Sequence, residues 1–147
     1  MAKTILVVDD DADTRDLLSE VLSLQGFQVH VARDGRHALQ VLAHIETPHL
    51  ILLDYLMPVM SGSLFLARKR RNPRLRPVPV VLLSAWTRAW SATRRDAVEV
   101  LSKPVDLVRL LALVERICAD QSRVSSPARA TDRGRGTFVE RRAIARI

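Results

Sequence analysis

The sequence predicts an α/β protein built on a parallel β-sheet. Short segments rich in Val, Ile and Leu alternate along the chain with segments whose apolar residues recur at helical spacing. Three of the strand-like segments are apolar throughout, which is typical of a parallel sheet covered on both faces. Five strand–helix units in succession favour one sheet whose strands are joined by right-handed crossovers.

The expected elements follow one another in regular order. The strands are expected at residues 4–9, 27–32, 50–54, 78–84 and 98–102. The helices are expected at residues 12–25, 35–44, 62–71 and 107–119. Asp11 and Asp13, then Asp34 and Asp106, are suited to cap the helices that they precede or begin, and Gly26 supplies a stop. The remaining connection, residues 86–96, has room for barely two helical turns.

Length and composition indicate one globular domain. The chain has 147 residues, of which 48% are hydrophobic and only 4% aromatic, so its core must be aliphatic. The apolar runs are far shorter than the ~20 residues of a membrane-spanning helix, and the N-terminus lacks the features of a signal peptide. Cys118 is the single cysteine and cannot form an internal disulfide, which favours a reducing, cytoplasmic location.

The net charge of +7 is concentrated in two places. Residues 68–76 contain six basic groups and no acid, and residues 121–147 contain seven arginines against two acids. The basic segment 68–76 is interpreted as a solvated helix end, although contact with an acidic partner or nucleic acid is left open. The composition of residues 121–147 predicts a flexible, disordered tail after a globular domain that spans residues 1–120.

Three carboxylates follow two of the buried strands. Asp9 and Asp10 end the first apolar run, and Asp54 ends the run of residues 50–53. Polar residues after a buried strand lie at its C-terminal edge, where open α/β sheets place their sites. Three carboxylates there repel one another unless a cation joins them, and an all-oxygen ligand set suits Mg²⁺.

Two further strands end in polar groups that phosphoryl transfer requires. Ser84 ends the fourth strand, and Lys103 follows the fifth. Asp54 could act as the nucleophile and form an acyl phosphate, while Asp9 and Asp10 hold Mg²⁺. Ser84 would donate a hydrogen bond to a phosphoryl oxygen, and Lys103 would neutralise charge.

Taken together, these motifs resemble the receiver domain of two-component response regulators. The resemblance rests on Val7-Val8-Asp9-Asp10-Asp11, Leu53-Asp54-Tyr55-Leu56-Met57-Pro58, Leu83-Ser84-Ala85 and Lys103-Pro104, in this order. It implies a flavodoxin-like, doubly wound (βα)5 fold with strand order 2-1-3-4-5. It also implies phosphorylation of Asp54 by a histidine kinase or phosphotransfer protein, the backbone carbonyl of Leu56 as a third metal ligand, and a cis peptide bond before Pro104.

Several positions depart from the family pattern. Val100 stands where the family usually has a switching Tyr or Phe, and Asp96 stands where a glycine is usual. Ser61 replaces an acidic residue, although Gly62 is kept. Leu56 and Trp86 occupy the two positions that flank the route of water to an aspartyl phosphate, and neither side chain can orient an attacking water.

The sequence is therefore interpreted as a single-domain response regulator, a switch rather than an enzyme acting on a separate small molecule. With only 27 residues after the domain, output is expected from docking to an unknown protein target or from passing the phosphoryl group on. Two alternatives stay open: a phosphorylation-independent interaction module, and a regulator that binds nucleic acid through residues 68–76 and the tail. Nucleic acid is the less favoured partner, and a homodimer is left open.

Overall fold

The computed structural model describes residues 2–85 and 95–130, with side chains up to residue 121. Five parallel strands form one sheet in the order β2-β1-β3-β4-β5. The strands are β1 (Thr4–Val8), β2 (Gln28–Ala32), β3 (Leu50–Asp54), β4 (Val80–Ser84) and β5 (Glu99–Ser102). The prediction of five strands in this order is confirmed. The first and last residues of each strand agree with the expected ones to within two residues.

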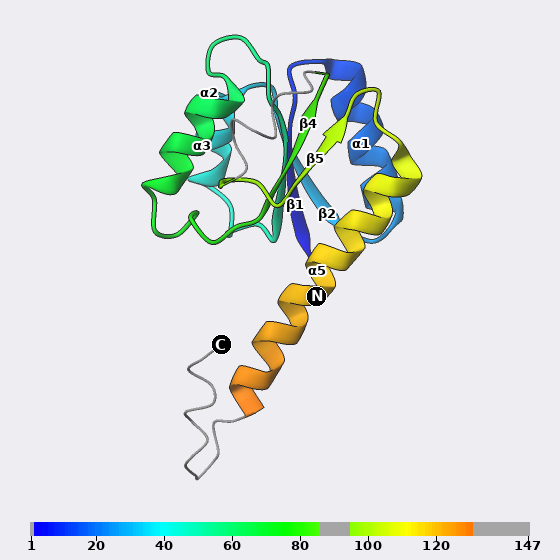
Figure 1. Cartoon of the computed structure of the whole chain (residues 1–147), viewed down its shortest axis with the longest axis vertical. Helices are drawn as coiled ribbons and strands as arrows, with labels where there is room; N and C mark the ends of the chain where they lie inside the picture. Colours follow the sequence, from blue (N-terminus) through cyan, green and yellow to red (C-terminus); the bar gives the residue numbers. More distant parts are fainter. Residues whose placement is uncertain (1, 86–94, 131–147) are drawn as a thin grey trace.

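The helices cover both faces of this sheet. They are α1 (Ala12–Leu24), α2 (Gly35–Leu42), α3 (Gly62–Arg70) and α5 (Leu107–Ala130). Figure 1 shows α2 and α3 on one face, and α1 and α5 on the other. In the described part of the chain, no helix is long and apolar enough to cross a membrane.

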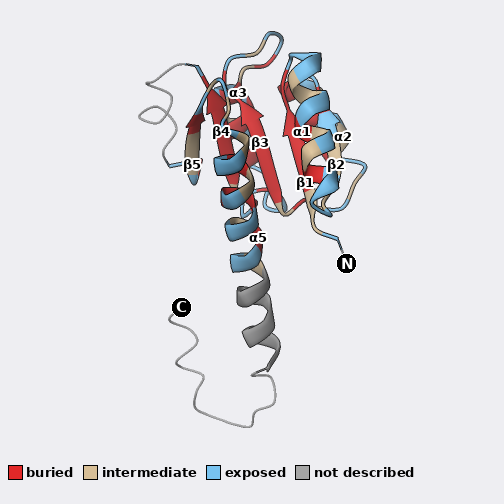
Figure 2. Ribbon diagram, turned by 90° about the vertical axis from the view of Figure 1, so that its right-hand side faces the viewer, coloured by how far each residue is buried: buried red, intermediate tan, exposed pale blue. Residues whose placement is uncertain are grey.

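The sheet separates two aliphatic cores. Alternate side chains of each strand point to opposite faces, so Leu6 and Leu53 pack toward α2 and α3, whereas Val7 and Leu52 pack toward α1 and α5. The central strands are buried along their length, as Figure 2 shows. Phe65 is the one aromatic side chain among the largest fully buried residues, in keeping with the aromatic-poor composition.

Local capping signals fix where the helices begin. The side chains of Asp11 and Asp34 accept hydrogen bonds from backbone N–H groups at the starts of α1 and α2, and Asp106 does the same for α5. Ser61 caps α3 through a bond from Leu64 N to its Oγ. Because all neighbouring strands pair in parallel, the strand ends that precede these caps lie at the same edge of the sheet.

Two expectations need correction. The last helix was expected to end at residue 119, with disordered chain after it, but α5 continues to Ala130. The basic segment 68–76 is not simply a solvated helix end, because Lys69 is buried. Arg74 also reaches across to the chain after α2, where its guanidinium donates to the carbonyls of Leu42 and Ile45. The boundary of the domain at residue 120 stays a prediction.

Candidate functional site

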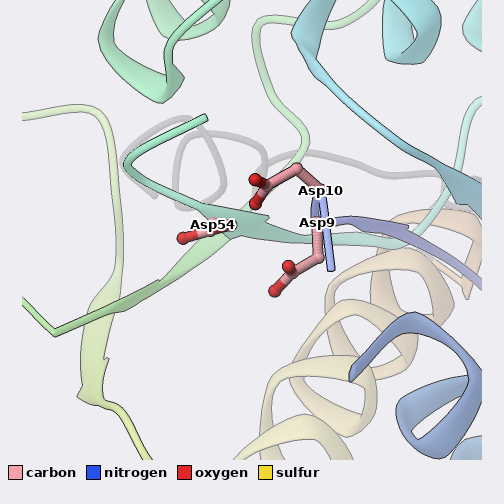
Figure 3. A group of neighbouring side chains, drawn as sticks. All are labelled: Asp9, Asp10 and Asp54. Atoms are coloured by element: carbon pink, nitrogen blue, oxygen red, sulfur yellow. The ribbon is translucent and has the colours of Figure 1, made fainter. Parts of the chain in front are cut away.

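The three predicted carboxylates lie together at the C-terminal edge of the sheet. Asp9 follows β1 and is fully buried, Asp54 is the last residue of β3 and is 5% exposed, and Asp10 is exposed. One carboxylate oxygen from each lies within 4.8 Å of those of the other two. Figure 3 shows the three side chains gathered where the first and third strands end.

The backbone around Asp9 is held on several sides. Its amide donates to the carbonyl of Ala32 at 3.1 Å, and its side chain accepts from the amide of Asp11 at 2.9 Å. Arg15 donates from Nη1 to the Asp9 carbonyl at 2.8 Å. The sequence reasoning missed Arg15, although its position four residues after the Asp11 cap returns it to this strand end after one helical turn.

Lys103 connects the buried carboxylates. Its Nζ lies 3.0 Å from Oδ2 of Asp9 and 3.3 Å from Oδ1 of Asp54. The backbone amide of Lys103 donates to the carbonyl of Ser84 at 3.0 Å, which ties the end of β5 to the end of β4. The Lys103–Pro104 peptide bond is cis, as the resemblance implied.

Ser84 and the loop after Asp54 complete this edge. Ser84 ends β4 and is 3% exposed, and the amide of Tyr55 donates to the carbonyl of Leu83. A Cβ on Gly62 would lie 2.9 Å from the Cα and the carbonyl oxygen of Tyr55, so only glycine fits where α3 begins. Leu56 is 59% exposed in this loop, and its role as a carbonyl ligand stays a prediction.

The remaining predicted positions have different outcomes. Val100 is half-buried and packs against the core beneath α2 and α3. An aliphatic side chain therefore occupies the position where the resemblance implies an aromatic switch residue. Pro104 follows the cis bond described above. Trp86 and the shortened connection around it lie outside the described residues, apart from residues 95 and 96.

The electrostatics of the site favour a bound cation. Burial, and then the charge of Asp9, raises the pKa of Asp54 from 3.8 to about 7, against the opposing effect of Lys103. Burial would lower the pKa of Lys103, but the hydrogen bond that its ammonium donates to Asp9 and the charge of Asp54 outweigh this effect, and the pKa is raised. The Lys103 ammonium contacts two of the three clustered carboxylates, those of Asp9 and Asp54. A divalent cation with oxygen ligands fits this donor set and its surplus of negative charge.

Comparisons with known proteins agree with this geometry. A family model described as a response regulator receiver domain matches residues 5–115. A probable chemotaxis protein CheY of Rhizobium etli is 32% identical over 117 residues, which are 77% of this chain and 90% of that protein. The regulatory protein AtoC of Escherichia coli is 39% identical over 121 residues, 80% of this chain but 26% of that longer protein.

Among solved structures too, this chain is similar to receiver domains and response regulators. The signal receiver domain of a histidine kinase from Syntrophus aciditrophicus has a TM-score of 0.73 and 31% identity, and the match covers 81% of this chain and 92% of that one. The chemotaxis response regulator CheY4 of Vibrio cholerae has a TM-score of 0.72 and 28% identity, with coverage of 80% and 99%.

Proposed function

Because this chain belongs to the family of response regulator receiver domains, we propose that it accepts a phosphoryl group on Asp54 and acts as a phosphorylation-dependent switch. The observation that carries the proposal is the joint placement of Asp9, Asp10, Asp54 and Lys103 at one strand edge. Receiver domains interact with histidine kinases or phosphotransfer proteins, and we assign this chain the same kind of donor.

The proposed chemistry is a transfer between two nucleophiles. A carboxylate oxygen of Asp54 forms a bond to phosphorus as the phosphorus–nitrogen bond to the donor's histidine breaks, and the released imidazole takes up a proton. Lys103 already contacts Asp54, and its ammonium can neutralise charge on a phosphoryl oxygen. Ser84, buried at the end of the neighbouring strand, is assigned the hydrogen bond to a second phosphoryl oxygen.

Asp9, Asp10 and Asp54 are the residues that would hold Mg²⁺, with the Leu56 carbonyl as a further ligand. When bound, Mg²⁺ supplies positive charge against the phosphoryl oxygens. A bound cation would also change the ionisation of Asp54. Without a cation, this carboxyl has a pKa of about 7 and is partly protonated at neutral pH. A nearby cation lowers that pKa and favours the ionised, nucleophilic form of Asp54.

The test is phosphorylation by acetyl phosphate and Mg²⁺, measured by intact-protein mass spectrometry. We expect one added phosphoryl group on the wild type, none on Asp54→Asn and none on Asp10→Ala at physiological Mg²⁺. Asp13→Asn, an exposed acid in the first turn of α1, is the matched control and should label fully. Equal labelling of wild type and Asp54→Asn would refute the assignment of the acceptor.

The output of this switch is assigned to protein–protein docking. The match to the receiver family ends at residue 115, within α5, and this helix continues to Ala130. The downstream target, a homodimer and the cytoplasmic location stay predictions. A pull-down with phosphorylated wild type and with Asp54→Asn distinguishes a phosphorylation-dependent partner from one that binds both forms equally.

A further inference from the structure

A cavity of about 320 Å³ lies at the end of the sheet opposite the carboxylates. The end of α3 and the segments that lead into β4 and β5 bound this cavity. It lies beside Val80, the first residue of β4, whereas Ser84 is the last. At about 3.3 Å per residue, roughly 13 Å of strand separates the cavity from the phosphoryl-acceptor site.

The walls of the cavity carry an excess of positive charge. Four basic side chains and a single acid line it: Lys69, Arg70, Arg76, Arg95 and Asp96. The three arginines that line the cavity are exposed, and we call them the arginine rim. Arginine presents planar pairs of donors that match phosphate oxygens, and lysine provides a point charge for the same group.

Lys69 lies deepest among these cations. Lys69 is only 6% exposed, and its Nζ donates a hydrogen bond to the carbonyl of Arg76 at 3.0 Å. An ammonium has three donors, and among the described residues the Arg76 carbonyl accepts a hydrogen bond from one of them. Burial lowers the pKa of Lys69, although the charge of Asp96 opposes this effect. An anion bound here would supply further acceptors and a counter-charge.

The one acid in the cavity is already engaged. Oδ1 of Asp96 lies 3.5 Å from Nε of Arg70, which ties the end of α3 to the segment before β5. The charge of Asp96 offsets one cation, and three basic groups remain in excess.

The other wall of the cavity is apolar. Pro77, Pro79 and Val98 line it beside the basic groups, and Val98 is 51% exposed. Ligand pockets commonly combine apolar walls of this kind with a few convergent charged groups, and their volumes begin near 300 Å³. A volume of about 320 Å³ is that of a small-molecule pocket and does not accommodate a folded macromolecule.

We propose that this cavity binds a small phosphorylated molecule, with its phosphate on Lys69 and the arginine rim and its ring against Pro77, Pro79 and Val98. The ligand class is a phosphomonoester that carries a planar or apolar ring, such as a nucleoside monophosphate. The site is independent of the acceptor aspartate, so it would bind its ligand in unphosphorylated protein and without Mg²⁺.

The proposal is tested by titrating the full-length, ¹⁵N-labelled protein with adenosine 5′-monophosphate in Mg²⁺-free buffer. We expect saturable amide shifts in residues 66–70, in Arg76, Val78 and Val80, and in residues 95–98, with a Kd of about 1 mM or below. Adenosine should give no saturable shift, and inorganic phosphate should bind more weakly than the nucleotide. If inorganic phosphate binds as tightly as the nucleotide, the apolar wall plays no part and that element of the proposal is overturned.

Three variants assign the binding to the cavity. Lys69→Met keeps the length of the buried side chain and should abolish binding, and Arg95→Gln, on the exposed rim, should weaken it about tenfold. Arg71→Gln removes a neighbouring exposed charge that does not line the cavity and should leave the Kd unchanged. If Lys69→Met does not fold, the comparison of Arg95→Gln with Arg71→Gln decides. Equal weakening by these two variants, shifts confined to the carboxylate end of the sheet, or no saturable shift would overturn the proposal.

Discussion

Replacing Asp54 with asparagine should stabilise the protein in a way that depends on pH. Asp54 is buried beside Asp9, and its pKa rises from 3.8 to about 7 on folding. Between these values the folded state binds more protons than the unfolded chain, so the wild type loses stability as pH rises through this window. Above about pH 7 the loss is complete. Asparagine has a similar shape and no charge, so the variant does not lose stability from ionisation at this position.

The size of the effect follows from the same shift. A difference of about three pKa units corresponds to an upper bound of about 4 kcal/mol at pH 8. Lys103 already contacts Asp54, and the variant replaces that ion pair by a weaker hydrogen bond, so we expect about 2 kcal/mol. At pH 4 the wild-type carboxyl is largely protonated in the folded state, and the two proteins should be almost equally stable.

The assay is urea unfolding at pH 4, 6 and 8, with and without saturating Mg²⁺. The gain in the free energy of unfolding of Asp54→Asn should grow from pH 4 to pH 8 in the absence of metal. Saturating Mg²⁺ should shrink the gain, because it stabilises the wild type through a ligand that asparagine supplies poorly. Asp13→Asn is the control and should show no growth of this kind. A gain that is constant across pH, or largest at pH 4, would refute the reasoning.

Three other substitutions test further contacts of the fold and site. Arg74→Ala removes the donors that satisfy the carbonyls after α2 and should cost about 1–2 kcal/mol in urea unfolding, whereas Arg71→Ala, a nearby exposed arginine, should cost less than about 0.5 kcal/mol. Equal costs would show that the bridging contacts of Arg74 contribute nothing. Gly62→Ala places a methyl group against the backbone of Tyr55 and should cost about 1–3 kcal/mol by the same measurement, and a neutral effect would contradict the close packing of this loop. Leu56→Asn adds a polar group beside the acceptor that can orient water, and should speed the loss of phosphate after donor removal about threefold, or about 0.7 kcal/mol of barrier. Unchanged decay would exclude this residue from the control of water.

The sequence alone was sufficient to predict that the carboxylates lie together. Asp9, Asp54 and Ser84 each end a short apolar run, and parallel strands bring such ends to one edge whatever the details of packing. The distances confirm this for Asp9, Asp10, Asp54 and Lys103. Strand order is less local, and its prediction depended on resemblance to a family rather than on periodicity.

The surroundings of the basic residues were decided only by the tertiary structure. In the sequence, Lys69 and Arg74 belong to a charged run that looks uniformly solvated. In the fold, Lys69 lies near the end of α3 and is covered by the segments before β4 and β5. Arg74 donates a hydrogen bond to the carbonyl of Leu42 at the end of α2. Periodicity records which side of an element a residue occupies, whereas the burial of a charge depends on what distant segments place around it. For that reason the gathering of the carboxylates could be predicted from strand ends, but the basic cavity could not.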